Sequence, residues 1–157
     1  MREIKMHIED TLLHKKFFNE ACLKMIDYLY EMKRDDEALE LARRCIIHDS
    51  SKLTDEEIDL FLQLPEEISG HKRQLTERHK ELLAVHWKNN RHHPEFYDDC
   101  NNMSEIDIIE MVCDWSARSM QFKNNVVEYA VETARKRFGF NDEMFEKILM
   151  YCRIMSE

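Results

Sequence analysis

Glycine and proline are almost absent from this sequence, which contains only two of each in 157 residues. These residues supply most tight turns, so their scarcity argues against an all-β fold. Charged residues make up 35% of the chain, and apolar residues are spread along its whole length. The composition predicts an all-α protein, a single domain that folds as a bundle of about six to seven helices.

The chain also lacks a positive charge balance, long apolar runs and CxxC motifs. Its formal net charge of -9 argues against general nucleic-acid binding, which requires a basic surface. A small phosphorylated substrate stays open, because bound cations reverse the local charge. No signal-peptide pattern and no membrane helix of roughly 18 apolar residues is found. The odd cysteine count predicts free, mostly buried thiols in a reducing cytoplasm: Cys22, Cys45, Cys100, Cys113 and Cys152.

Helical periodicity of the apolar residues predicts helices at about 7–32, 35–48, 54–61, 71–92, 124–138 and 141–155. A further helix should follow Ser104, whose spacing to Asp107 resembles a capping box, as does the spacing of Thr54 and Glu57. We expect one domain, with a core at about 7–120 and C-terminal helices at 121–157. Apolar residues of the last helix should complete the core, although they also suit a homodimer face: Met144, Phe145, Ile148, Leu149, Tyr151 and Ile154.

Four ionisable residues interrupt these apolar stretches: His14, His48, Asp49 and Asp114. Each needs a partner, because burying an unpaired carboxylate or imidazole is costly. Each alone also fits a simpler role, such as a core histidine, a helix end or an ion pair with an arginine. Together, on three separate helices, they predict one divalent-metal site. Imidazole and carboxylate ligands favour Mn, Fe, Ni, Co or Zn over calcium.

A second group of histidines follows. His79, His86 and His93 are seven residues apart and therefore lie on nearly one helix face. We interpret His79 as solvated and expect His86 to face a metal. His92 and His93 are alternatives, and the choice depends on where the helix ends. Nearby polar residues that suit holding the ligands from behind are Asn89, Glu95, Asp107 and Glu110, although Asp107 equally fits a helix cap.

The order of a histidine, a His-Asp pair and a distant aspartate resembles the signature of the HD-domain superfamily of metal-dependent phosphohydrolases. The run from His48 to Lys52 is similar to the HD-x-x-K run of the HD-GYP phosphodiesterase branch, whose Gly-Tyr-Pro motif is missing here. A looser similarity joins the chain to an uncharacterised family of small bacterial and phage proteins. That family combines HD-x-SK, HHPE and EMxxDW motifs, found here at 48–52, 92–95 and 110–115.

The resemblance implies an HD-type helical bundle and a phosphohydrolase that attacks a nucleotide or another small phosphate ester with metal-activated water. One metal would be held by His14, His48, Asp49 and Asp114, and a second would be bridged by Asp49. The second metal would also be held by His86 and one of His92 or His93. Two alternatives remain: an HD-type di-iron oxygenase and a non-catalytic metal-binding or interaction protein.

Two basic residues are candidates for binding the phosphate. Lys52 follows the His-Asp pair and is expected to be catalytic by neutralising charge that develops on the phosphate. Asp49 is expected to be catalytic as the carboxylate that bridges the two metals. The alternative for Lys52 is a solvated loop lysine. Arg118 is a weaker candidate, and a salt bridge from it to Asp114 or Glu110 is at least as good an interpretation.

Overall fold

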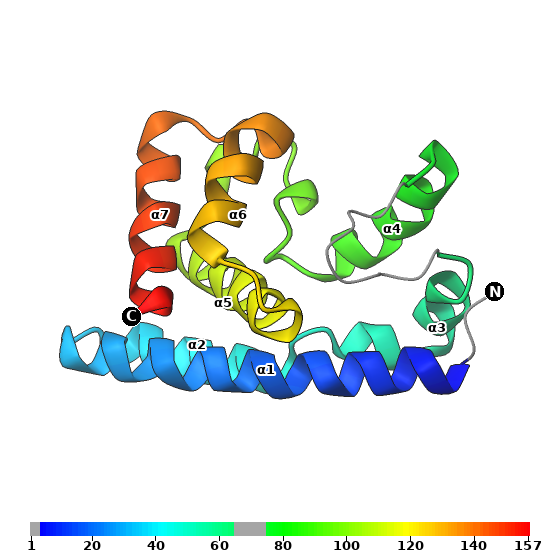
Figure 1. Cartoon of the computed structure of the whole chain (residues 1–157), viewed down its shortest axis with the longest axis horizontal. Helices are drawn as coiled ribbons and strands as arrows, with labels where there is room; N and C mark the ends of the chain where they lie inside the picture. The colour runs from blue at the N-terminus through cyan, green and yellow to red at the C-terminus, as the bar shows by residue number, and fades with distance from the viewer. Residues whose placement is uncertain (1–3, 65–74) are drawn as a thin grey trace.

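The computed structural model describes residues 4–64 and 75–157 of the chain. These residues form seven α-helices and no strand, so the all-α prediction is confirmed (Figure 1). None of the helices in the described ranges is long and apolar enough to span a membrane.

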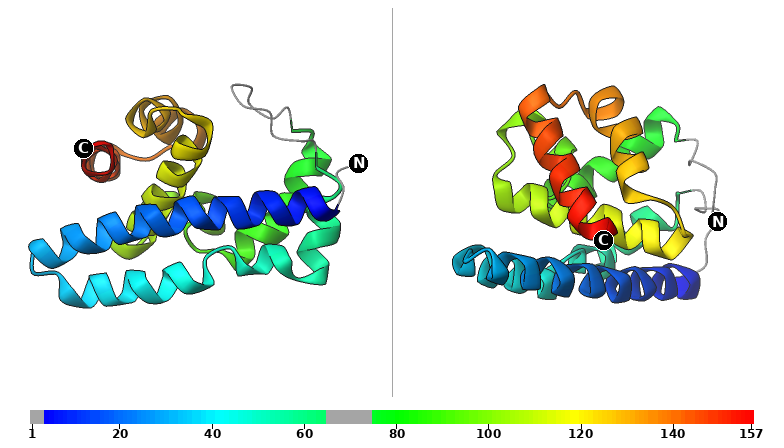
Figure 2. Two further views of the ribbon diagram at one scale, coloured as in Figure 1. Left: turned by 60° about the horizontal axis from the view of Figure 1, so that its bottom comes forward. Right: turned by 60° about the vertical axis from the view of Figure 1, so that its left-hand side comes forward.

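The first two helices, α1 (Ile4–Glu31) and α2 (Asp35–Ile47), form an antiparallel pair that makes one layer of the molecule (Figure 2). Helix α1 turns a stripe of buried side chains toward the other helices, spaced by three or four residues as one helix face requires. This stripe includes His14, Phe18, Met25 and Leu29.

Helix α5 (Glu105–Phe122) lies on this layer, and α6 (Val126–Thr133) and α7 (Asp142–Ser156) lie beyond it. Ser104 and Asp107 form the expected capping box at the start of α5. The buried apolar residues of α7 complete the main core, as preferred from the sequence: Met144, Phe145, Ile148, Leu149 and Tyr151.

The remaining elements lie at the other end of the α1–α2 layer: η1 (Ser50–Leu53), α3 (Asp55–Phe61) and α4 (Glu77–Asn89). Part of the helix expected at 71–92 lies outside the described residues. Helix α4 ends at Asn89, three residues earlier than expected. The side chain of Asn90 bonds to the backbone oxygen of His86 and to Ser51, and these bonds end the helix. Consequently His92 and His93 lie outside the helix, and their side chains are not held 100° apart as on a helix.

Two further segments differ from the expected elements. The stretch expected to be a loop contains two short 3-10 turns, η2 (Pro94–Phe96) and η3 (Cys100–Asn102). The helix expected at 124–138 continues from α6 into a π-helical turn, η4 (Ala134–Phe138).

The expectation of five free thiols is wrong for two of them. Cys22 on α1 and Cys45 on α2 form a disulfide, whereas Cys100, Cys113 and Cys152 are free and buried. The antiparallel packing of α1 and α2 brings the paired cysteines together, and neither their count nor their spacing shows this. Because two of the five cysteines are joined in a disulfide, the cysteines do not indicate a reducing cytoplasm.

Candidate metal centre

The His48-Asp49 pair lies where helix α2 ends. Neighbouring side chains on a helix point about 100° apart, so two adjacent residues cannot both face one point. Here α2 stops at Ile47, and Asp49 adopts a left-handed backbone with φ 52°, a conformation that aspartate tolerates better than most residues. Both side chains turn into the same interior space, where their residues are only 2% and 1% exposed.

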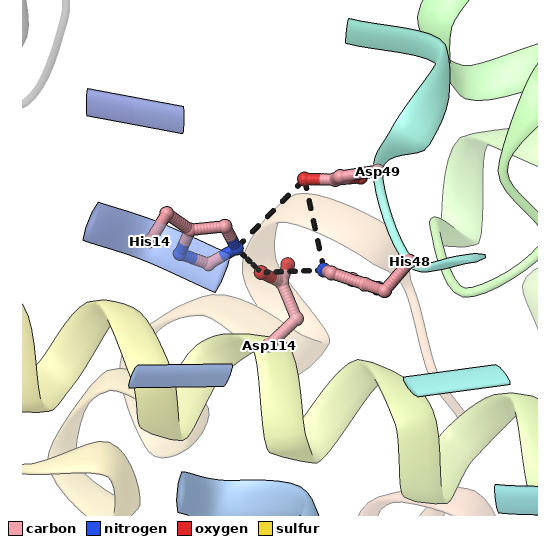
Figure 3. Close-up of side chains that lie close together, drawn as sticks. All are labelled: His14, His48, Asp49 and Asp114. Carbon is pink, nitrogen blue, oxygen red and sulfur yellow. Dashed lines mark ion pairs between the residues drawn. The ribbon is translucent and has the colours of Figure 1, made fainter. Parts of the chain in front are cut away.

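Two other helices complete a first group of possible ligands (Figure 3). His14 comes from α1 and Asp114 from α5, and His14 Nε2 lies 2.9 Å from Asp114 Oδ1. His48 Nε2 lies 3.7 Å from the same oxygen. The four predicted residues each offer one ligand atom, all within 4.8 Å of one another.

A second group lies on the other side of Asp49. His86 comes from the last turn of α4, and its Nε2 lies 3.5 Å from Asp49 Oδ1. His92 Nε2 lies 3.6 Å from that oxygen, and His93 Nε2 lies 3.0 Å from His86 Nε2. Because α4 ends at Asn89, the structure brings both His92 and His93 to this group rather than one of them.

Asp49 joins the two groups through its two carboxylate oxygens. Its Oδ2 lies 3.8 Å from His14 Nε2 and 3.6 Å from His48 Nε2. Its Oδ1 faces the nitrogens of His86 and His92 instead. One oxygen of a single carboxylate therefore faces each group, which is the arrangement of a bridging ligand.

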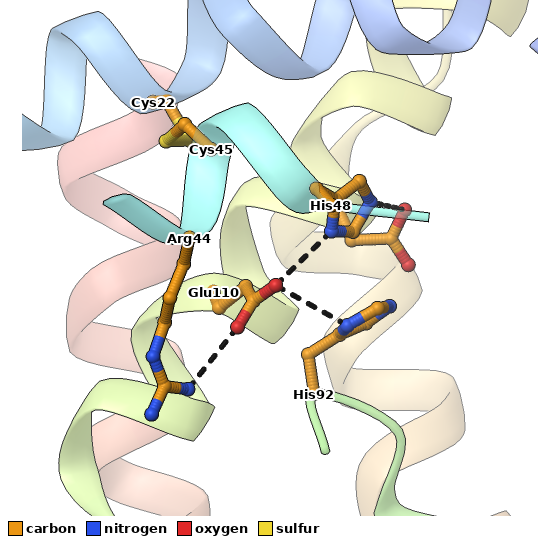
Figure 4. Close-up of a disulfide and its surroundings, with 7 residues drawn as sticks. Cys22, Arg44, Cys45, His48, His92 and Glu110 are labelled. Carbon is orange, nitrogen blue, oxygen red and sulfur yellow. Dashed lines mark hydrogen bonds and ion pairs between the residues drawn. A yellow bond between two sulfur atoms is a disulfide. The ribbon is translucent and has the colours of Figure 1, made fainter. Parts of the chain in front are cut away.

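Glu110 of α5 holds two of the histidines from behind (Figure 4). Its Oε1 lies 3.1 Å from His48 Nδ1 and 3.4 Å from His92 Nδ1. Arg44 donates to its other oxygen at 3.2 Å. This contact agrees with the role expected of Glu110 and leaves both Nε2 atoms directed at Asp49.

Glu57 holds His86 in the same way and was missed by the sequence analysis. Its backbone N–H donates to Thr54, as a cap requires, but its buried side chain does not complete the expected capping box. The carboxylate accepts from His86 Nδ1 at 2.7 Å and from Asn89 at 2.9 Å. A Thr-x-x-Glu segment looks the same in the sequence whether the glutamate completes a capping box or bonds to a distant histidine. No local signal therefore distinguishes the two roles.

The site strongly shifts the protonation of its own groups. Burial alone would lower the pKa of His48, but the surrounding carboxylates, Asp49 foremost, raise it to about 9. Burial would raise the pKa of Asp49, but Lys52 and the neighbouring imidazoles hold it well below its usual range. Burial and a nearby positive charge lower the pKa of His14 to about 4. The site therefore combines ionised carboxylates with a neutral imidazole, as metal ligation needs.

Lys52 is not a solvated loop lysine. Its residue is 8% exposed, and its ammonium forms an ion pair with Asp49 Oδ2. His7 Nε2 donates to the backbone oxygen of Lys52 at 2.9 Å, and the His7 ring stacks on Phe61. The Lys52 ammonium itself lies over Phe61, 5.5 Å from the ring centroid. These contacts fix a cation beside the oxygen that faces the first group.

Two other predicted residues contact side chains outside the two groups of histidines, although the charge of Arg118 still helps to lower the pKa of His14. Arg118 contacts Gln121 and Asp10. Glu95 is paired with Arg137, 2.8 Å away.

Asp107 caps α5 and also accepts from Arg44, so it reaches the histidines only through Arg44 and Glu110. Burial would raise its pKa, but hydrogen bonds from Arg44 and Ser104 hold the pKa far below its usual range. Asp107 thus has both roles expected from the sequence: it caps α5, and it holds Arg44, which in turn contacts Glu110.

The donor set fits one or two divalent transition-metal ions. Among the buried atoms without a hydrogen-bond partner in the described residues are three that lie around the Asp49 carboxylate: His48 Nε2, His92 Nε2 and Asp49 Oδ1. A buried polar atom without a partner costs about 1–3 kcal/mol, and a cation bound between these atoms would remove that cost. Imidazole nitrogen and carboxylate oxygen are the donors that such ions prefer, and carboxylates behind the rings are typical of metal-bound histidines.

Comparison with known proteins identifies a family whose function is unknown. No curated protein and no solved structure matches the chain. One family model matches residues 3–154, nearly the whole sequence, and its description is a family of unknown function, DUF5662. The chain therefore belongs to the DUF5662 family.

Proposed function

We propose that the protein is a metal-dependent phosphohydrolase in which the Asp49 carboxylate bridges two divalent ions. The observation that carries the proposal is the placement of the two Asp49 oxygens, one facing each group of imidazole nitrogens. The orphaned Oδ1 and the two orphaned Nε2 atoms support it, because a cation would satisfy all three. The resemblance of the motifs to the HD-domain superfamily points the same way.

Two such ions would supply a nucleophilic water at neutral pH and would stabilise the attacking and leaving oxygens. Lys52 is placed beside Asp49 Oδ2, where its ammonium can neutralise charge on a phosphate. Asp114 and His93 are partly exposed, whereas the other ligand residues are buried. We therefore infer that a substrate reaches the metals from the side on which Asp114 and His93 are exposed. The net charge of -9 favours a small phosphate ester or nucleotide over a nucleic-acid chain.

The test compares three proteins: wild type, Asp49→Ala and the control Glu95→Gln, which changes a carboxylate paired with Arg137 instead of the histidines. Metal content is measured after loading with manganese, nickel or cobalt, and phosphate release is followed with a panel of nucleotides and simple phosphate esters. We expect wild type and Glu95→Gln to bind metal and release phosphate, and Asp49→Ala to lose both. Metal binding by Asp49→Ala equal to that of wild type overturns the proposal.

A second candidate is a di-iron oxygenase. The observation that favours it is the imidazole-rich second group, in which His86, His92 and His93 surround one oxygen of Asp49. Iron binds such nitrogen and oxygen donors well. Protein purified without added metal separates the two: paired irons with a mixed-valence signal and oxygen consumption favour the oxygenase. Bound metal without phosphate release or oxygen consumption favours a non-catalytic metal-binding protein.

A further inference from the structure

One carboxylate oxygen of Glu110 contacts histidines from both groups. Glu110 Oε1 lies 3.1 Å from His48 Nδ1 and 3.4 Å from His92 Nδ1. His48 belongs to the group with His14 and Asp114, whereas His92 faces the opposite oxygen of Asp49. Figure 4 shows Glu110 between the two rings, with Arg44 on its far side. The two groups are thus joined twice, by Asp49 at the centre and by Glu110 behind the rings.

This contact fixes the tautomer of both rings. An ionised carboxylate only accepts hydrogen bonds, so each ring must present Nδ1–H to Glu110 and turn Nε2 toward a ligand position, where a bound metal displaces any proton that Nε2 carries. Rotation of Glu110 would disturb both Nε2 atoms together.

Arg44 restrains that rotation. Its Nη1 donates to Glu110 Oε2 at 3.2 Å and to Asp107 Oδ1 at 2.6 Å, and its Nε donates to Glu40. The next residue, Cys45, is tied to α1 through its disulfide with Cys22. The guanidinium is therefore held by three carboxylates and by a cross-linked helix.

We propose that Glu110 is a shared positioning residue that couples the two metal positions, so that one substitution weakens both. This inference rests on the proposed two-metal centre. Glutamine is nearly the same size but has only one acceptor oxygen. If that oxygen faces the histidines, the amide N–H group faces Arg44, a donor; if it faces Arg44, both Nδ1–H groups lose their acceptor.

Glu57 provides the matched control. It is also buried and holds a ring from behind, but its carboxylate bonds to His86 and to Asn89. Asn89 can rotate its own amide to suit a glutamine at position 57. The fold should then be preserved, but His86 loses its anionic partner, so Glu57→Gln should weaken the second group and leave the first unchanged.

The experiment measures zinc affinity of the full chain in two backgrounds, each keeping one position. His93→Ala removes a ligand of the second group and Asp114→Ala a ligand of the first. Glu110→Gln is expected to weaken zinc binding roughly 10- to 100-fold in both backgrounds, the usual effect of losing a partner behind a ligand. Glu57→Gln is expected to do so only in the Asp114→Ala background. In zinc-loaded protein, the imidazole N–H signals of His48 and His92 should shift with Glu110→Gln and stay with Glu57→Gln.

The possible outcomes are distinct. Weakening by Glu110→Gln in one background alone overturns the shared role but leaves the two-metal centre intact. Equal weakening by Glu57→Gln in both backgrounds also overturns it, because the effect is then a general loss of structure. Absence of zinc binding by the wild-type protein overturns the proposed function itself.

Discussion

Nε2 of His86 lies 3.0 Å from Nε2 of His93, although His86 lies in the last turn of α4 and His93 precedes η2. Burial foremost lowers the pKa of both rings, so both are neutral at pH 7. Two facing lone pairs repel, so without metal one ring must donate an Nε2–H hydrogen bond to the Nε2 lone pair of the other. Because His86 Nδ1–H donates to Glu57, the donor in this pair is His93. Two nitrogens at metal–ligand distances of about 2.1 Å and a right angle are about 3 Å apart, so the same geometry suits one ion.

The first prediction concerns the number of ions. His93→Ala should reduce the bound metal from two equivalents to one, because the first group of ligands does not include His93. Metal analysis after dialysis measures this stoichiometry. His79→Gln is the control, since His79 is half-buried at the start of α4, where its side chain accepts from the backbone of Thr76 instead of facing Asp49. Retention of two equivalents by His93→Ala would show that His93 is not a ligand of the second ion.

The second prediction is the pH dependence of metal binding. The pKa of His48 is raised to about 9 in the metal-free protein, so His48 is protonated at pH 7 and a metal must displace that proton. Affinity should therefore rise with pH, by about tenfold per unit, until the pH reaches the pKa of His48. The carboxylates add nothing in this range, because the pKa values of Asp49, Asp114 and Glu110 are all lowered.

Calorimetry in buffers of different ionisation enthalpy measures the proton released on metal binding. About one proton should be released per first ion at neutral pH, and fewer as the pH approaches the pKa of His48. An affinity that is constant between about pH 6.5 and 8.5 would contradict the assignment of His48 as a ligand.

Most of the fold is predictable because its signals are local. Helical periodicity and the scarcity of glycine and proline indicate helices without any knowledge of their packing. The ligand candidates are also visible, because a charged group inside an apolar stretch needs a partner wherever that stretch packs. His14, His48, Asp49 and Asp114 met this condition, and the structure brings all four together.

The remaining features depend on contacts between distant segments. Glu57 and His86 are 29 residues apart, and the glutamate has the spacing of an ordinary cap. The pairing of Cys22 with Cys45 requires the antiparallel packing of α1 and α2. Likewise, the early end of α4 follows from the bond between Asn90 and Ser51 of η1. None of these contacts can be predicted from the sequence of a single helix or loop, because each joins residues on different elements.

The third prediction concerns the disulfide. Cys22 and Cys45 are 23 residues apart, and closing a loop of this size stabilises the folded state by about 3 kcal/mol. Reduction of the wild-type protein should therefore lower its free energy of unfolding by about that amount in urea titrations. A Cys22→Ser/Cys45→Ser variant should be equally destabilised and insensitive to reductant. Equal stability of oxidised and reduced protein would show that the pair contributes nothing to the fold.

The last prediction separates two roles of Lys52. In the metal-free protein its ammonium is the nearest buried counter-ion of Asp49. Lys52→Met leaves the protonated His48 as the main remaining cation beside that carboxylate and should cost up to roughly 3–5 kcal/mol of stability. Metal binding should restore this stability, and metal affinity should rise, because the lysine no longer competes for Asp49.

Turnover of a phosphate ester by metal-loaded Lys52→Met should nevertheless fall about a hundredfold, since a cation that stabilises developing charge is lost. Lys88→Met, which changes an exposed lysine of α4, is the control for both measurements. Tighter metal binding with unchanged turnover would mean that Lys52 only balances the charge of Asp49. A loss of turnover beside tighter metal binding cannot arise from loss of metal, and it therefore assigns Lys52 to the phosphate.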